Sequence, residues 1–126
     1  MAVALIAAQV LAAVAMVDVW LLRYDKPLRA RGGDAQTMVE EFEVYGLPGW
    51  FRNVVRVLKL SAGAMLVFGL WNPLVAFAGG ALLAVLMAGA IAMHIKIRDP
   101  WLKSVPATFF FLLSGFIAYG HSGFLA

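Results

Sequence analysis

The ionisable residues that could do chemistry are few, and they gather at the borders of long apolar runs. Asp18 lies near the end of the first run, Lys59 inside the second, and His94 near the end of the third. Glu43 and Arg56 can reach the same level from the segment between the first two runs and from the start of the second. If the runs are antiparallel helices, these five candidate ligand-binding residues all fall at one end of the molecule. Ionisable groups at membrane depth are costly and usually face a partner or a water-filled cavity.

Two interpretations of this group remain open. In the structural one, Asp18 pairs with Lys59 or Arg56, and His94 is an interfacial cap on the last turn of its helix, favourable for the helix dipole when charged. In the functional one, the group lines a polar cavity open to the cytoplasmic leaflet. There, His94 and Lys59 donate hydrogen bonds to the head group of a quinone or a lipid.

The residue types exclude many catalytic chemistries. The chain has no cysteine, which excludes disulfides, thiolate nucleophiles, cysteine-ligated zinc and iron–sulfur clusters. It shows no Ser-His-Asp triad, phosphate-binding loop or metal-ligand spacing. Its two histidines, His94 and His121, fall near opposite ends of a helical bundle, roughly 25 Å apart, which disfavours a shared metal or haem. We expect no metal site and no catalysis by this chain on its own.

The elements that position these residues follow from an apolar composition. The chain has 126 residues, is 63% hydrophobic, and has a mean hydropathy of +0.89. A soluble domain this small could not bury so much apolar surface, so the surrounding solvent must be lipid. We predict an all-α membrane protein, with residues 1–126 forming one integral membrane domain. The predicted architecture is an up-down bundle of four transmembrane helices, with spans at about 2–22, 53–70, 73–96 and 105–120 and a connector at 23–52.

The third run is the centre of this bundle. Between Trp71 and His94 no residue is charged, and those residues make a helix of roughly 35 Å, against ~30 Å for a bilayer's hydrocarbon core. Lys96 and Arg98 place positive charge at the lipid surface, and Pro100 cannot continue the helix. Small residues recur every four positions, which predicts a helix-packing face. These residues are Ala76, Gly80, Ala84, Ala88 and Ala92.

The connector is the one long polar segment, and it predicts a short amphipathic helix. Asp34 can cap a helix that runs from Ala35 to about Tyr45. Met38, Phe42 and Tyr45 share one face of it, so it should lie at the membrane interface or under the bundle.

The basic residues predict the orientation. All ten Lys and Arg fall within Arg23–Lys59 and Lys96–Lys103. The positive-inside rule places both basic loops in the cytoplasm and both termini outside it. This distribution concerns topology, and the net charge of +3 does not indicate a nucleic-acid partner.

Several short motifs occur in a familiar order. The connector ends in Gly46-Leu47-Pro48, and the next helix contains Val-Leu-Lys-Leu-Ser-Ala-Gly-Ala at 57–64. A short Asn72-Pro73 turn follows, then Met-Ala-Gly-Ala-Ile-Ala-Met-His at 87–94 and Asp99-Pro100. This order resembles the DoxX-like family of small bacterial four-helix membrane proteins and covers nearly the whole chain.

The resemblance carries functional implications. It implies a four-helix bundle in the inner membrane. The family takes its name from a subunit associated with terminal quinol oxidase and thiosulfate:quinone oxidoreductase activity, and related proteins act as partners or assembly factors for other membrane proteins. Many relatives carry an acidic residue where Lys59 stands, so a carboxylate site does not carry over. Only the glycine-alanine stretch and His94 match the family pattern cleanly.

Three functions compete. The small number of polar residues in the predicted spans favours an accessory or interaction subunit that packs on a larger membrane complex or on further copies of itself. The alternative is a quinone- or lipid-binding component of a membrane oxidoreductase, with its cavity at the cytoplasmic leaflet. A small transporter is a third hypothesis. It is disfavoured because four-span exporters of this length depend on a carboxylate in the middle of helix one, where this chain has Gln9.

Overall fold

The computed structural model describes residues 2–125, and within them the regular structure is entirely helical. Thus the prediction of an all-α protein is confirmed. The helices are α1 (Ala2–Val17), which continues as the π-helical turn η1 (Asp18–Leu22), then α2 (Met38–Tyr45), α3 (Gly49–Phe68), α4 (Pro73–Lys96), the 3₁₀ turn η2 (Trp101–Ser104), α5 (Val105–Gly120) and the 3₁₀ turn η3 (Ser122–Leu125).

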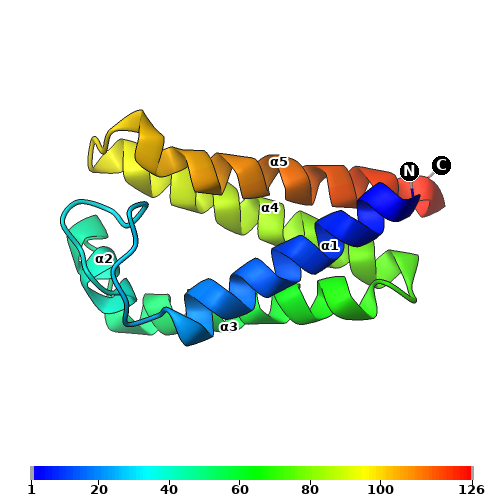
Figure 1. The fold of residues 1–126 in the computed structure, drawn as a ribbon, viewed down its shortest axis with the longest axis horizontal. Coiled ribbons are helices and arrows are strands. Elements are labelled where there is room, and N and C mark those ends of the chain that lie inside the picture. The colour runs from blue at the N-terminus through cyan, green and yellow to red at the C-terminus, as the bar shows by residue number, and fades with distance from the viewer. Residues whose placement is uncertain (1, 126) are drawn as a thin grey trace.

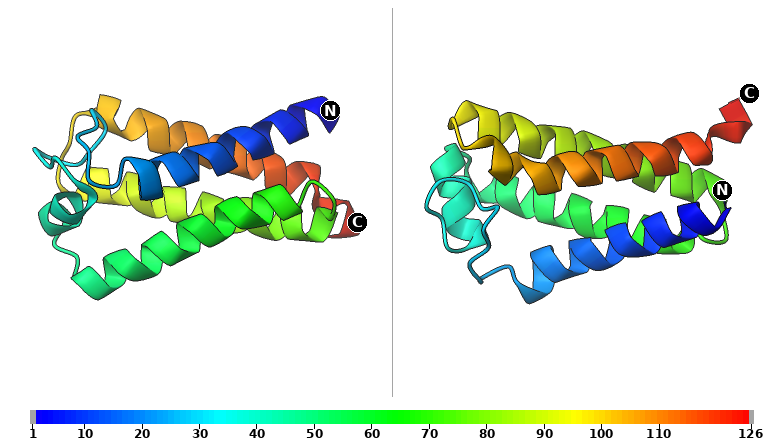
Figure 2. Two further views of the ribbon diagram at one scale, coloured as in Figure 1. Left: turned by 60° about the horizontal axis from the view of Figure 1, so that its bottom comes forward. Right: turned by 45° about the horizontal axis from the view of Figure 1, so that its top comes forward.

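The long helices α1, α3, α4 and α5 run alongside one another, and α2 covers one end of them (Figure 1). Helix α4 packs on α3 and α5, and α1 packs on the same two helices. Two further views agree that α2 and its loops lie across one end, while the chain termini lie at the other (Figure 2). We call these the α2 end and the terminal end.

Three helical segments are long and apolar enough to cross a membrane within the described part of the chain: Ala2–Leu22, Pro73–Lys96 and Trp101–Gly120. At most a third of each is buried inside the protein, so their apolar surface needs an apolar surrounding. These helices fit an integral membrane protein. Helix α3 is of similar length but carries three basic residues, Arg52, Arg56 and Lys59.

Helix α3 begins at Gly49, four residues before the predicted start of the second span. Pro48 is extended and serves as its N-cap residue, so Gly49, Trp50 and Phe51 already form the first turn of the helix. A proline at this position loses nothing, because the first N–H groups of a helix have no partner within it. By contrast, the bounds of α4 and α5 coincide with the predicted ranges.

The connector departs from its prediction at the start of α2. The predicted Asp34 cap is wrong, because α2 begins at Met38 and its N-cap residue is Thr37. The Thr37 hydroxyl accepts a hydrogen bond from the Glu40 N–H at 3.1 Å. Thr-x-x-Glu is a stronger N-terminal signal than a lone aspartate. Helix α2 ends at Tyr45 as expected, and its apolar face of Met38, Phe42 and Tyr45 is buried.

The stripe of small residues on α4 lies inside the bundle at the start of the helix and faces outward near its end. Ala76 and Gly80 are buried, Ala84 is half-buried, and Ala88 and Ala92 are exposed. An α-helix turns about 100° per residue, so a four-residue repeat drifts about 40° at each step. The buried face of α4 instead continues through Leu83, Met87 and His94.

Candidate functional site

A cavity of about 640 Å³ lies at the α2 end, within the range typical of small-molecule sites. Its wall is mainly apolar and is formed by α1, α3, α4 and α5, with α2 and the connector closing the polar side. The apolar lining includes Val19, Trp20, Phe42, Val55, Met87 and Phe110. The polar lining includes Asp18, Arg31, Glu41, Tyr45, Lys59 and His94. An amphiphilic ligand suits this combination of an apolar wall and a polar end.

Lys59 is a buried cation on this cavity that has no hydrogen-bond or salt-bridge partner from residues 2–125. It stands on α3 and is only 8% exposed. Its Nζ lies 4.8 Å from the centroid of the Trp20 ring, which is a cation–π contact. Within residues 2–125, its ammonium has no hydrogen-bond acceptor and no carboxylate within 4 Å. The Lys59 Nζ is not among the solvent-inaccessible side-chain atoms that lack a partner, so it opens onto the cavity, where a ligand can reach it. Buried polar groups in proteins are nearly always hydrogen-bonded.

His94 is held by a second polar cluster on the same cavity. It is 5% exposed, and its Nδ1 lies 2.7 Å from Asp99 Oδ2. The other oxygen of Asp99 accepts from the Gly33 N–H at 3.0 Å. A carboxylate on Nδ1 fixes the tautomer with Nδ1–H, which leaves Nε2 as an acceptor. The Tyr45 hydroxyl faces this Nε2 at 3.5 Å, a long hydrogen bond that a ligand could replace.

Tyr45 is a hydrogen-bond donor at every physiological pH. Burial raises the pKa of its hydroxyl above the ordinary value, and the nearby Glu41 carboxylate raises it further. The hydroxyl therefore stays protonated. It can donate a hydrogen bond to an oxygen in the cavity whenever it leaves His94.

Arg31 and Glu41 neutralise each other beside the cavity. Arg31 is 2% exposed, and its guanidinium donates to the carbonyl oxygens of Arg23, Tyr24 and Lys26 at 2.6, 3.2 and 2.9 Å. Its Nη1 lies 3.9 Å from Glu41 Oε1, and Glu41 Oε2 accepts from a backbone N–H at 2.8 Å. The connector is thus folded around one guanidinium that has few donors left.

The structure divides the five predicted ligand-binding residues. Asp18, Lys59 and His94 line the cavity, whereas Arg56 and Glu43 do not. Glu43 is exposed on α2. Arg56 Nε donates to the Trp20 carbonyl oxygen at 3.1 Å instead. Its guanidinium also lies 4.1 Å from the centroid of the Tyr24 ring.

The predicted pairing of Asp18 with Lys59 or Arg56 is wrong. Asp18 forms a salt bridge with Arg23, five residues along the chain, whose Nε lies 3.0 Å from Asp18 Oδ1. The wider π-helical turn at the end of α1 brings this pair together. His94 is likewise buried in contact with Asp99 rather than standing free at the interface.

Sequence reasoning missed Tyr45 and Asp99 as site residues. Tyr45 was identified only as part of the apolar face of α2, although a tyrosine on such a face brings a hydroxyl to the protein it packs on. Asp99 lies just past the end of α4 and before Pro100, where the chain turns back on the helix. Its backbone N–H bonds the His94 carbonyl oxygen at 3.0 Å, which brings the carboxylate to the imidazole.

The terminal end holds a different polar cluster. Gln9, in the middle of α1, is 1% exposed and donates from Nε2 to the Leu66 carbonyl oxygen at 3.0 Å. Its Oε1 lies 2.9 Å from His121 Nε2. His121 and His94 therefore belong to separate clusters at opposite ends of the bundle. Residues 2–125 contain no group of three His, Cys, Asp or Glu that could hold a metal ion.

Comparison with known proteins agrees with the resemblance seen in the sequence. The sequence profile of the DoxX-like family matches residues 30–116, which include Tyr45, Lys59, His94 and Asp99. The chain is also 32% identical over 83 residues to YdgD, an uncharacterized protein of Bacillus subtilis (strain 168). That alignment covers 65% of this chain and 73% of YdgD. No solved structure matches the chain. The match over more than half of its length shows that the chain belongs to the DoxX-like family.

Proposed function

We propose that this chain is a four-span protein of the bacterial cytoplasmic membrane that binds an amphiphilic small molecule in the cavity at its α2 end. The head group of that molecule carries oxygens that accept hydrogen bonds, as a quinone or a lipid head group does. The observation that carries the proposal is the buried Lys59 ammonium, which faces a largely apolar cavity without a hydrogen-bond partner from residues 2–125.

Helix α3 is the proposed fourth span. Its 20 residues correspond to about 30 Å, the thickness of a hydrocarbon core. Arg52 and Arg56 lie within the first eight residues of α3, close to the α2 end, where basic side chains reach the lipid surface. Lys59 is the one basic residue that lies deeper, and it faces the cavity rather than lipid.

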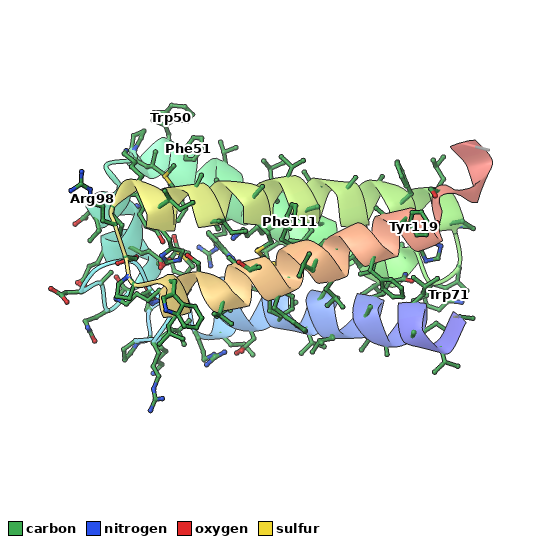
Figure 3. The ribbon with its side chains drawn as sticks, turned by 90° about the horizontal axis from the view of Figure 1, so that it is seen from above. Trp50, Phe51, Trp71, Arg98, Phe111 and Tyr119 are labelled. Atoms are coloured by element: carbon green, nitrogen blue, oxygen red, sulfur yellow. The ribbon has the colours of Figure 1, made fainter. Side chains whose placement is uncertain are left out.

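Aromatic residues support the same membrane placement. Figure 3 shows Trp50 and Phe51 beside Arg98 at the α2 end, and Trp71 and Tyr119 toward the terminal end. Trp50, Trp71 and Tyr119 are 68%, 78% and 76% exposed. Tryptophan and tyrosine are enriched at both interfaces of a bilayer. The basic loops all lie at the α2 end, so the positive-inside rule supports a cytoplasmic α2 end and external termini.

The test uses Trp20, which lines the cavity, as a fluorescent reporter. Replacing the exposed Trp50, Trp71 and Trp101 by Phe leaves Trp20 as the single tryptophan. We expect a short-chain quinone, decylubiquinone, to quench Trp20 saturably in the protein purified in a mild detergent. Quenching that rises linearly with quinone and never saturates would argue against a binding site.

A matched pair of variants on α4 tests the location. Ala90 lines the cavity, whereas Ala88 is exposed two residues earlier on the same helix. We expect Ala90→Phe to weaken quinone binding at least tenfold because the ring would occupy part of the cavity that the quinone needs. Ala88→Phe should leave binding within twofold. Equal effects of the two variants would place the bound quinone elsewhere, on the lipid-facing surface.

A role as an accessory subunit is the second candidate function. Ala88 and Ala92 face outward from α4, and small residues let a helix of another chain approach closely. Native mass spectrometry after gentle extraction should then show a co-migrating polypeptide that Ala88→Phe releases. A retained small-molecule mass without any partner chain would favour the ligand-binding function alone.

A further inference from the structure

We infer that the ligand of this cavity is a single-chain amphiphile with a carboxylate head group, bound with its carboxylate on Lys59 and its hydrocarbon chain along the apolar wall. The inference rests on the proposed function and narrows it from any oxygen-bearing head group to a monoanion. It follows from the charges around the cavity.

The acidic residues near the cavity are already paired. Asp18 is bound by Arg23, Glu41 by Arg31 and a backbone N–H, and Asp99 by His94 and a backbone N–H.

The remaining acidic residues do not reach Lys59 either. Asp25, Asp34 and Glu43 are exposed, and Glu40 accepts from the Gln36 N–H at 3.2 Å. None of the seven Asp and Glu lies within 4 Å of the Lys59 ammonium. Three further cations line the cavity: Arg23 pairs with Asp18, Lys103 donates to the Gly33 carbonyl oxygen, and Arg29 is exposed. Within residues 2–125, Lys59 is therefore the buried cation of the lining that has no carboxylate partner.

A bound anion corrects this imbalance, whereas a neutral head group does not. Burying an ammonium without a counter-charge costs free energy, because the group loses its hydration. The Trp20 ring offsets only part of that cost. A carboxylate supplies both the missing charge and the missing acceptors, and a charge-assisted hydrogen bond is about twice as strong as a neutral one.

The number of free donors favours a carboxylate over a larger anion. Lys59 provides one charge, and Tyr45 provides at most one hydroxyl, which faces His94 Nε2 at 3.5 Å and also interacts with the Glu41 carboxylate. The guanidinium of Arg31 is occupied by three carbonyl oxygens and Glu41. Arg29 and Lys103 also line the cavity, but Arg29 is exposed and Lys103 donates to the Gly33 carbonyl oxygen. Phosphate groups are usually held by several donors, and among residues 2–125 Lys59 is the buried cation here that is not already paired. The rings of Trp20, Phe42 and Tyr45 form a continuous row, with centroids 6.0 and 5.9 Å apart, between Lys59 and His94.

The experiment compares two ligands that differ only in the head group. The probes are undecanoate and undecanol, and each is measured by its displacement of decylubiquinone, which restores the fluorescence of Trp20. They are titrated at pH 7.5 into the protein that keeps Trp20 alone. We expect the carboxylate to bind at least tenfold more tightly than the alcohol. Equal affinities of the two probes would overturn the inference, and this comparison needs no substitution of Lys59.

A variant pair then assigns the preference to Lys59. We expect Lys59→Met to remove the preference for the carboxylate while binding of the alcohol remains. Lys26→Met is the matched control, since Lys26 is an exposed lysine at the same end of the bundle. It should keep the preference. A preference that survives in Lys59→Met would overturn the inference.

The outcomes separate this inference from the proposed function. Saturable binding of decylubiquinone that Ala90→Phe blocks, with no preference for a carboxylate, would sustain the proposed function and overturn the inference. Loss of saturable binding for every probe would overturn both.

Discussion

Two buried polar groups at opposite ends of the bundle differ in how their polar atoms are satisfied. At the terminal end, the amide of Gln9 donates to the Leu66 carbonyl oxygen, and its own oxygen lies within hydrogen-bonding distance of His121. At the α2 end, Lys59 is nearly as buried, but within the described residues its ammonium contacts the face of Trp20 and no hydrogen-bond acceptor. Both groups stand in apolar helices, so polarity alone does not separate structure from function. The distinguishing feature is whether the protein itself supplies the partners.

The helix packing differs in the same way. At Gly80, α4 and α5 touch so closely that a Cβ atom would lie 2.9 Å from the Ser114 carbonyl oxygen and 3.0 Å from the Ala118 nitrogen. At Gly89, nearer the α2 end of the same helix, a Cβ atom would meet nothing within 4 Å. The terminal end is thus closed by backbone contact, whereas the α2 end leaves the space that forms the cavity.

The largest change in stability is expected for substitution of Gly80, with Gly89 as the matched control. We expect Gly80→Ala to lower the free energy of unfolding by about 1–3 kcal/mol, because the added methyl group overpacks the α4–α5 contact. Gly89→Ala should leave it unchanged or raise it by up to about 1 kcal/mol through helix propensity. Unfolding by sodium dodecyl sulfate, followed by circular dichroism, measures both. Equal losses would mean that the two ends are packed alike.

Replacing Gln9 and replacing Lys59 should change the free energy of unfolding in opposite directions. The Leu66 carbonyl lies in the last turn of α3, where intrahelical donors run out, and Gln9 supplies a donor for it. Gln9→Leu should therefore destabilise the protein by about 1 kcal/mol. Lys59→Met should be neutral or stabilising, because it removes a buried charge that has no salt-bridge partner among residues 2–125.

The same unfolding titration compares these variants with the unsubstituted chain. A Lys59→Met variant that loses as much stability as Gln9→Leu would make Lys59 a structural residue. It would also weaken the case for a ligand at the α2 end.

The smallest effect concerns Tyr45 and pH. Because burial raises its pKa above the ordinary value of 10.0, the folded chain keeps the hydroxyl proton where the unfolded chain begins to lose it. This group therefore leaves stability unchanged at neutral pH and lowers it as pH rises through 10. We expect a fall of less than about 1 kcal/mol between pH 9 and 10.5. Tyr45→Phe should reduce that fall. If the free energy of unfolding of this variant depended on pH as it does in the unsubstituted chain, burial of the hydroxyl would be contradicted.

Much of the fold could be predicted because it depends on local composition. The apolar runs determined that the protein is helical and suited to a bilayer, and the bounds of α4 and α5 coincide with the predicted ranges. The up-down order of the predicted helices likewise placed Asp18, Lys59 and His94 at one end of the bundle. Lipid solvates each span separately, so hydropathy along the chain carries this information without knowledge of the neighbouring helices.

The partners of the site residues could not be predicted, because each depends on a few ångströms of three-dimensional placement. The π-helical turn at the end of α1 brings Asp18 into contact with Arg23, and the turn after α4 brings Asp99 into contact with His94. In the part of the chain that the structure describes, Lys59 is left without a carboxylate partner. The sequence by itself determined which residues are polar and at which level of the bundle they lie. Only the tertiary structure decided which of them are satisfied, since helix rotation and loop geometry, rather than composition, set the distances between side chains.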